Sequence, residues 1–569
     1  MNTNMRVTIR HLTNAFVLLL LVLSAAAAYV QIGNSAPFSG PQLVGGGFET
    51  QSRLCPRIDK PLRGTIYDDK GNWIAKTMSD NGTESYICGY HRVYAQWAID
   101  TGLSTLIGYA TYSRGSSGIE ASYDAQLSGN TPSNSATDNI NNTVNKLLHK
   151  PQFGQDLYLT IDKNVQEAAN KYYESSVETG SPGGSCPTTS NQSGSITVED
   201  PKTGAILAMV SKPNYDPNKI VDSDSLTSSV RAQADQYWAG VQNAKPSVLL
   251  NRAAQGLYAP GSTFKTVTLA AALDTGKYAL TDTGTTGFTQ DQAMSYTVSG
   301  HTFNWDDVSA FQAVAKFPMS LQDGYAYSDN VIYARLGVDL GFDTWVHYVG
   351  QFGIETPGKN WNQNVGFDSV YAQSSAYPQF STGGQSGLSD VDLAASAFGQ
   401  GQLLISPLTM AVVSSTIANN GVLARPHAGL ALAAHGGTAA SGAQVRDPST
   451  DTQVVQPGTA QNMRAAMWAV SSYGTGGYGN GPDPNFGSKL TTSGVFEGGK
   501  TGTAQASGQP GAWWISLAPD DQAPGAPGGA RYVIVVNKEG NPATPNQLNE
   551  GACQVYVADD IYRTLLGIQ

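Results

Sequence analysis

The sequence contains few cysteines and histidines and no cluster of basic residues. Its 569 residues include only 4 Cys and 7 His, and none of them has the spacing of a metal-binding motif. The formal net charge is −11, and no run of Lys and Arg is present. Because phosphate binding requires clustered cations, this charge argues against a nucleic-acid-binding face. We therefore expect no metal, no other cofactor and no nucleic-acid partner.

A long apolar run is present near the N-terminus. It extends from about residue 12 to residue 30 and follows Arg6, Arg10 and His11. About 20 apolar residues span a bilayer, and the positive flank favours a cytoplasmic N-terminus. We predict a cytoplasmic segment over residues 1–11 and a transmembrane anchor over residues 12–31. The alternative is a cleaved signal peptide, because the small residues of Ala25-Ala26-Ala27 suit cleavage. Either way the rest of the chain is exported.

The remaining sequence is too long for a single core. Residues 32–47 have the Gly, Pro and Ser content of a tether. Residues 48–155 have mixed character, and residues 156–569 have strand-like segments at both ends with helical segments between them. We predict an α+β fold in which helices cover the faces of an antiparallel sheet. A smaller N-terminal domain and one transmembrane helix precede it.

Three short motifs follow one another in the larger segment. They are Ser262-Thr263-Phe264-Lys265, Ser328-Asp329-Asn330 and Lys500-Thr501-Gly502. Each is weak alone, since Ser-x-x-Lys also describes a helix N-cap with a solvated lysine one turn later. The ordered triplet, however, is typical of serine acyl-transfer enzymes. Ser79-Asp80-Asn81 and Lys202-Thr203-Gly204 repeat two motifs ahead of Ser262, and we predict that both are turns.

With this triplet the chain resembles a class B penicillin-binding protein, the membrane-anchored D,D-transpeptidase of bacterial cell-wall synthesis. Arg63-Gly64-Thr65-Ile66-Tyr67-Asp68 resembles a signature of the family, although Asp69 stands where Arg is usual. Gly118-Ile119-Glu120 with Tyr123-Asp124 resembles a signature of its pedestal domain, and Gly399-Gln400-Gly401-Gln402 is also similar to the family. The resemblance implies a pedestal over residues 48–155 and a penicillin-binding transpeptidase domain over residues 156–569.

The residue types suit this chemistry. Ser262 at a helix start and Lys265 one turn later form a pair of nucleophile and base. An ordinary lysine pKa near 10.4 makes deprotonation at pH 7 cost about 4.6 kcal/mol, so burial and a second cation, Lys500, must lower that cost. The resemblance implies that Ser328 relays a proton and that Asn330 binds the substrate amide.

The resemblance also assigns substrate binding and oxyanion stabilisation. Thr501 and Thr503 bind the terminal carboxylate, Gly502 lets the peptide lie close to the strand, and Asp329 is a further substrate-binding residue. The backbone N–H groups of Ser262 and Thr503 form the oxyanion hole, a contribution of about 3 to 4 kcal/mol per donor.

The implied reaction joins peptidoglycan stem peptides through an acyl-enzyme on Ser262, with release of D-Ala and inhibition by β-lactams. A glycosyltransferase of the SEDS family is the implied protein partner.

A D,D-carboxypeptidase remains an alternative, because only the access of the acceptor amine separates the two reactions. A β-lactamase or β-lactam sensor is disfavoured, since no Glu-x-x-Leu-Asn is present. A bifunctional class A protein would need a preceding glycosyltransferase domain. The intact motifs argue against a non-enzymatic scaffold.

Four cysteines in an exported chain are candidates for two disulfides. They allow three pairings. In the implied architecture Cys55 and Cys88 share the pedestal, whereas Cys186 and Cys553 lie near the two ends of the transpeptidase domain. We predict the pairs Cys55–Cys88 and Cys186–Cys553, with buried free thiols as the alternative.

Overall fold

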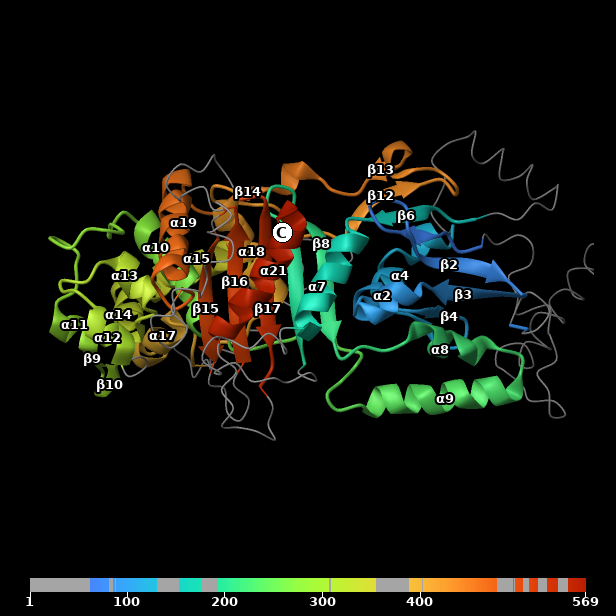
Figure 1. Cartoon of the computed structure of the whole chain (residues 1–569), viewed down its shortest axis with the longest axis horizontal. Helices are drawn as coiled ribbons and strands as arrows, with labels where there is room; N and C mark the ends of the chain where they lie inside the picture. Colours follow the sequence, from blue (N-terminus) through green and yellow to red (C-terminus); the bar gives the residue numbers. More distant parts are fainter. Residues whose placement is uncertain are drawn as a thin grey trace, which may run out of the picture.

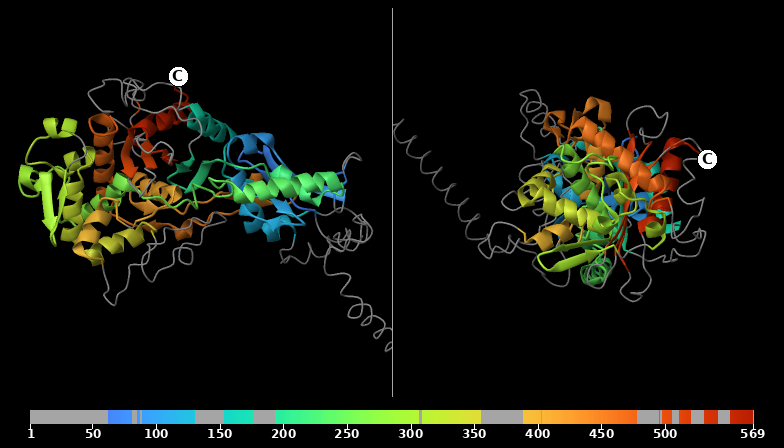
Figure 2. Two further views of the ribbon diagram at one scale, coloured as in Figure 1. Left: turned by 90° about the horizontal axis from the view of Figure 1, so that it is seen from below. Right: turned by 90° about the vertical axis from the view of Figure 1, so that its left-hand side faces the viewer.

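The computed structural model describes two domains arranged end to end (Figures 1 and 2). The described residues are 62–80, 85–86, 89–129, 153–175, 193–305, 309–354, 388–401, 403–477, 495, 497–504, 511–519, 530–540 and 551–568. The predicted anchor and tether lie outside these ranges. Within the ranges no helix has the length and apolar character needed to cross a membrane.

The larger domain is built on a five-stranded antiparallel sheet of order β15-β16-β17-β7-β8. Its strands are β15 (Gly498–Ala504), β16 (Gly511–Ala518), β17 (Tyr532–Lys538), β7 (Gly194–Asp200) and β8 (Ala205–Lys212). Strands from the two ends of the domain sequence thus share one sheet, which confirms the predicted antiparallel core.

Helices cover both faces of this sheet. On one face, Tyr562 of α21 (Val555–Leu566) contacts Ser516 of β16, with 3.0 Å between the hydroxyl oxygens, and α7 (Lys163–Ser175) packs beside α21. On the other face, Glu199 of β7 contacts Ser415 of α18 (Pro407–Ala418). The two contacts lie on opposite faces because side chains alternate along paired strands. All 12 residues of α18 are buried, so it is a central helix of the domain.

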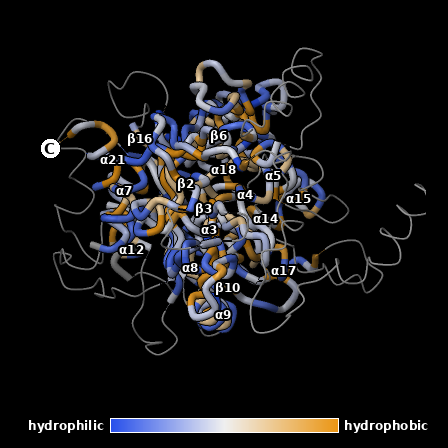
Figure 3. Tube along the Cα trace, turned by 90° about the vertical axis from the view of Figure 1, so that its right-hand side faces the viewer, coloured by the Kyte–Doolittle hydropathy of each residue, from blue (hydrophilic) through white to orange (hydrophobic). Residues whose placement is uncertain are grey.

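A helical region follows on the far side of α18. It contains α10 (Lys265–Asp274), α13 (Leu321–Ala326), α14 (Asn330–Leu340), α15 (Phe342–Gln351), α17 (Asp390–Ala397) and α19 (Pro457–Ser472). Every residue of α10 except Asp274 is buried, and Thr268 is the one polar residue between Val267 and Leu273. In the smaller domain, α9 (Ser228–Asn243) runs along the periphery of the molecule (Figure 1) and buries only Ala234 and Val241. Viewed along the long axis, α9 lies at the edge of the molecule (Figure 3).

The smaller domain contains a six-stranded sheet, and it corrects the predicted domain boundary. The order is β13-β12-β6-β1-β2-β3. Its strands are β13 (Ala443–Gln444), β12 (Gly429–Ala433), β6 (Asp156–Leu159), β1 (Ile66–Tyr67), β2 (Trp73–Ser79) and β3 (Tyr90–Tyr94). A boundary between residues 155 and 156 would assign β6 to the larger domain, although β6 pairs in parallel with β1 in the sheet of the smaller domain. Strands β12 and β13 also return to this sheet from within the larger domain, because β6 has a free edge to which β12 adds in antiparallel fashion.

The two pedestal-like signatures meet at a buried carboxylate. Glu120 is fully buried and accepts hydrogen bonds from Arg63, Arg92 and Tyr94. Burial alone would raise the Glu120 pKa, but the charges of Arg92 and Arg63 outweigh it and lower that pKa. Asp69 stands where the family signature usually has Arg. Burial and the neighbouring Asp162 raise the Asp69 pKa to about 6.

The early copies of the second and third motifs have structural roles. Lys202-Thr203-Gly204 forms the turn between β7 and β8, where Gly204 has φ +73° and donates its N–H to Asp200 O at 2.8 Å. This turn receives the chain that returns to the smaller domain, since His427 N donates to Gly204 O at 2.9 Å. Ser79 ends β2, and Asn81 lies outside the described residues. The turn prediction is confirmed for the Lys202 copy.

Candidate active site

Ser262 lies in a short 3-10 helix, η4 (Gly261–Phe264), that continues directly into α10. Gly261 has φ +53° and donates its N–H to Gly399 O at 3.0 Å. A Cβ atom on Gly399 would lie 1.8 Å from Gly261 O, so only glycine permits this approach. The family-like segment that begins at Gly399 therefore supports the turn that carries Ser262.

Lys265 joins the first two motifs. Its side chain is fully buried, and its Nζ donates to Ser262 Oγ at 2.7 Å and to Asn330 Oδ1 at 2.7 Å. The same Nζ lies 2.8 Å from Ser328 O and 3.2 Å from Ser328 Oγ. Within one helical turn, Lys265 thus reaches the nucleophile and both polar side chains predicted to assist it.

The second motif owes its geometry to a left-handed residue followed by a helix start. Ser328 has φ +60°, a conformation that costs about 1–3 kcal/mol for a non-glycine residue. Asp329 Oδ1 accepts the N–H groups of Val331 and Ile332 at 2.7 and 3.1 Å and so caps α14. Asp329 is fully buried and caps this helix, and its predicted contact with substrate stays a prediction.

The third motif places a second buried lysine beside Ser328. Lys500 Nζ donates to Ser328 Oγ at 2.9 Å and to Thr501 O at 3.0 Å. The Ser328 hydroxyl therefore lies between the two ammonium groups. Burial and the charge of Lys265 hold the pKa of Lys500 well below its ordinary value. Two full positive charges are thus disfavoured here until an anion binds.

The remaining residues of the third motif lie on the edge strand β15. Thr501 and Thr503 share one side of the strand, as their i, i+2 spacing predicts. A Cβ atom on Gly502 would lie 2.8 Å from both Pro260 O and Thr263 Cγ2. Gly502 is therefore required for β15 to lie against the nucleophile turn, which is a different reason from the predicted approach of substrate. The oxyanion hole predicted from the N–H groups of Ser262 and Thr503 stays a prediction.

Several side chains that surround the two lysines could not be identified from sequence motifs. The rings of Tyr333 and Phe398 lie 5.7 and 6.0 Å from Lys265 Nζ, and the Tyr325 ring lies 5.6 Å from Lys500 Nζ. Thr475 Oγ1 is 2.6 Å from Thr501 Oγ1. These residues occur in no recognisable motif, since their proximity depends on tertiary packing.

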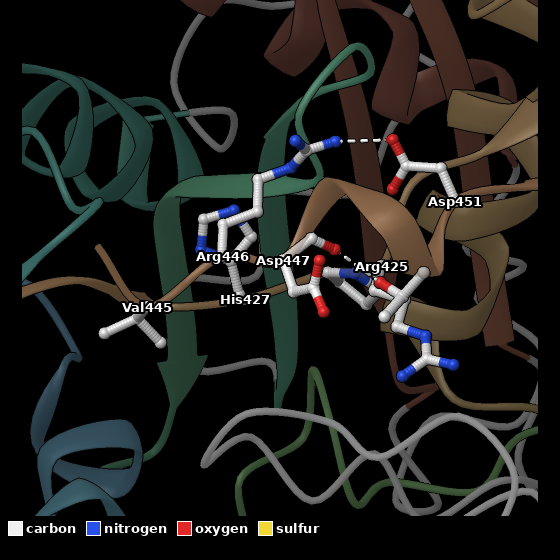
Figure 4. A pocket seen from close by; sticks show the side chains of 8 residues that line it. Arg425, His427, Val445, Arg446, Asp447 and Asp451 are labelled. Atoms are coloured by element: carbon white, nitrogen blue, oxygen red, sulfur yellow. Dashed lines mark hydrogen bonds and ion pairs between the residues drawn. The ribbon is translucent and has the colours of Figure 1, made fainter. Parts of the chain in front are cut away.

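A small cavity of about 100 Å³ lies elsewhere, beside the β7–β8 turn (Figure 4). Arg446 closes one side of it by donating to Asp451 at 2.6 Å and to Thr203 O at 2.8 Å. None of the three motifs contributes a residue to its lining. Among the described residues, no group of three or more His, Cys, Asp or Glu side chains is placed to hold a metal ion.

Of the cysteines, only Cys553 lies within the described ranges, and it is disulfide-bonded. Cys55, Cys88 and Cys186 lie outside them, so the predicted pairing stays a prediction.

Comparison with known proteins agrees with this site. A model of the penicillin-binding protein transpeptidase domain matches residues 194–553, and one of the penicillin-binding protein A dimerisation domain matches residues 63–150. The chain belongs to the penicillin-binding protein transpeptidase family. The first match contains all three motifs. The second covers the signatures that meet at Glu120.

Individual relatives are distant. The chain is 29% identical over 457 residues to the peptidoglycan D,D-transpeptidase PbpA of Mycolicibacterium smegmatis, covering 79% of each protein. It is 25% identical over 416 residues to the peptidoglycan D,D-transpeptidase MrdA of Escherichia coli, covering 70% of this chain and 56% of MrdA. The imipenem acyl-enzyme of penicillin-binding protein A from M. tuberculosis has a similar fold, with a TM-score of 0.67 at 21% identity over 90% of this chain and 99% of that one.

Proposed function

We propose that this protein is a peptidoglycan D,D-transpeptidase that forms an acyl-enzyme on Ser262. The observation that carries the proposal is the distance of 2.7 Å between Lys265 Nζ and Ser262 Oγ, within a buried cluster that includes Ser328 and Lys500. The names of the PbpA and MrdA relatives support peptidoglycan as the substrate class.

Acylation begins when neutral Lys265 takes the proton of Ser262 and Oγ attacks the carbonyl carbon of the penultimate D-Ala. The N–H groups of Ser262 and Thr503 stabilise the oxyanion, and Lys500, Thr501 and Thr503 bind the terminal carboxylate. The Ser328 hydroxyl, within reach of both ammonium groups, delivers a proton to the leaving amine as the C–N bond breaks. Lys265 returns its proton to Ser328, and D-Ala leaves. The amine of a second stem peptide then attacks the acyl carbon, forming the new amide as the ester bond to Ser262 breaks, and the proton lost by the amine returns to Ser262 Oγ.

A β-lactam follows the same first step, but its ring-opened leaving group stays attached to the acyl chain. The chain has no Glu-x-x-Leu-Asn to activate a hydrolytic water, so the adduct is long-lived. A D,D-carboxypeptidase is the second candidate, since the acyl-enzyme is the same. Product analysis with and without an acceptor amine separates the two activities.

The apolar run at residues 12–31 supports a single-pass anchor in the bacterial cytoplasmic membrane, with the catalytic domain on the extracytoplasmic side. A SEDS-family glycosyltransferase is the protein partner that the family resemblance favours.

Fluorescent penicillin followed by intact-mass spectrometry tests the acyl-enzyme. We expect one adduct per chain, mapped to the peptide that contains Ser262 and absent in Ser262→Ala. Ser79→Ala and Lys202→Ala are matched controls, because they alter the early copies of the motifs and should be labelled normally. Label retained by Ser262→Ala would contradict the assignment.

A further inference from the structure

Thr501 has a hydrogen-bond partner outside the three motifs. Thr475 lies three residues after the end of α19, and its Oγ1 is 2.6 Å from Thr501 Oγ1. The Thr475 N–H donates to Ala326 O at 3.0 Å, two residues before Ser328. Thr475 therefore contacts both the segment that carries Ser328 and the strand that carries Lys500.

The backbone around Thr475 is tightly held. A Cβ atom on Gly474 would lie 2.3 Å from Ala326 O, and one on Gly476 would lie 2.9 Å from the Trp514 ring. Tyr473 adds a link, because its hydroxyl lies 2.8 Å from Asp323 Oδ1 of α13. With glycine required on both sides, the position of the Thr475 hydroxyl is set by packing.

The hydrogen bond between the Thr475 and Thr501 hydroxyl groups can run in either direction. Each threonine hydroxyl has one proton, so one of the two donates and the other accepts. If Thr501 donates to Thr475, only lone pairs of Thr501 face an incoming carboxylate, and they repel it. If Thr475 donates, the Thr501 proton is free to bind a carboxylate oxygen, and such charge-assisted bonds are the strong ones.

We propose that Thr475 is a positioning residue that donates its hydroxyl proton to Thr501 and thereby directs the Thr501 proton toward the carboxylate of the acyl donor. This inference rests on the proposed function, in which Thr501 binds that carboxylate. The recognised group is an anionic carboxylate, as found both at a D-Ala terminus and on a penicillin.

Thr475→Val removes the hydroxyl at nearly constant volume, and Thr475→Ser retains it. The second-order rate constant of acylation is measured with a penicillin and with its uncharged methyl ester. We expect Thr475→Val to slow acylation by the acid about 10- to 100-fold, the loss of one charge-assisted hydrogen bond. The loss with the ester should be below about 3-fold, and Thr475→Ser should restore most of the rate.

Thr459→Val is the matched control. Thr459 lies in the first turn of α19, and its hydroxyl donates to Asp274 at 2.7 Å, so the variant loses a threonine hydrogen bond at the opposite end of the helix. The Thr459→Val variant should still be acylated faster by the penicillin than by its methyl ester, in the same ratio as the wild type. If Thr475→Val does not fold, Thr475→Ala replaces it in the same assay.

Equal losses for acid and ester, or no recovery in Thr475→Ser, would overturn the positioning role. Failure of the proposed function is a separate outcome, because it would appear as label retained by Ser262→Ala whatever Thr475 does.

Discussion

The Ser328 hydroxyl lies between two buried lysines, and this arrangement determines how each lysine can be used. Lys265 contacts Ser262 and is the only one of the two within reach of the nucleophile among the described contacts. The depressed pKa of Lys500 reflects its burial and the charge of Lys265. A bound carboxylate beside Lys500 would raise that pKa again and favour the charged form. A charged Lys500 in turn disfavours a second positive charge on Lys265, as the proposed role of Lys265 as a base requires.

The two lysines should therefore fail differently when each is replaced by arginine. A guanidinium cannot be deprotonated near neutral pH, so Lys265→Arg should slow β-lactam acylation by about three orders of magnitude or more. Lys500→Arg keeps the positive charge and should be milder. Stopped-flow acylation rates of the two variants check this prediction. Equal rate constants would contradict the division of roles.

Glu199 should make stability depend on pH. It is fully buried against α18, and burial raises its pKa to about 8 from an unfolded value of 4.5. Between these pH values the folded state keeps a proton that the unfolded state has lost. The contribution of Glu199 to the free energy of unfolding is therefore complete below pH 4.5 and falls by about 1.4 kcal/mol per pH unit as the pH rises toward 8.

Glu199→Gln should remove this slope, so that its advantage over the wild type grows by about 4 kcal/mol between pH 5 and pH 8. Urea unfolding followed through the fluorescence of the buried Trp513 and Trp514 measures it. Glu167→Gln, which alters an exposed carboxylate of α7, is the control and should leave the slope unchanged. A wild-type slope that persists in Glu199→Gln would rule out Glu199 as its source.

The start of α14 links helix capping to catalysis. Asp329→Ala leaves the buried N–H groups of Val331 and Ile332 without an acceptor, a loss of about 1–3 kcal/mol. It also frees the flanking Ser328 and Asn330, so acylation should fall at least about 10-fold. Asp329→Asn retains an oxygen acceptor and should be tolerated.

Ser389→Ala tests whether this effect is specific to α14. Ser389 caps α17 by accepting the N–H of Asp392, so its loss should cost about 1 kcal/mol without slowing acylation. Thermal unfolding and acylation rates, measured on all three variants, separate stability from catalysis. If Ser389→Ala slows acylation as much as Asp329→Ala does, the specific role of the α14 cap is lost.

Local patterns predicted the helices and strands well where periodicity and turn residues agree. The predicted strand-like segments at both ends of the larger domain form its sheet, and the predicted helical segments between them include α10, directly after Ser262, and α18. The motifs also identified which side chains meet around Lys265. Their backbone conformations were less predictable, because the left-handed turn at Ser328 and the cap formed by Asp329 depend on how α13 and α14 pack.

The connection between the two domains was not predictable from local patterns. Strands β12 and β13 leave the larger domain and extend the sheet of the smaller one, a pairing across more than 250 residues. The returning chain is held at the β7–β8 turn, where Arg446 donates to Thr203 O and a Cβ atom on Gly204 would lie 2.1 Å from Arg425 O. The chain therefore crosses between the two domains several times. These crossings fix the pedestal relative to the catalytic sheet.

The disulfide of Cys553 should stabilise the third motif as well as the domain. Cys553 lies in η7 (Gly551–Gln554), and Gly551 N donates to Thr503 Oγ1 at 3.3 Å. A Cβ atom on Gly551 would lie 2.6 Å from Gly502 O, so η7 packs directly on β15. A bond to Cys186 would close a loop of several hundred residues, worth about 6 kcal/mol in the chain-entropy model.

Non-reducing peptide mapping of protein exported to an oxidising compartment should recover Cys186 with Cys553 and Cys55 with Cys88. Cys186→Ser should then lower the melting temperature and slow acylation, because η7 loses its tether beside Thr503. Cys55→Ser alters the pedestal alone and should leave the acylation rate unchanged. Recovery of Cys553 with Cys55 or Cys88 would defeat the pairing, and normal acylation in a fully folded Cys186→Ser would show that Thr503 keeps its position without this bond.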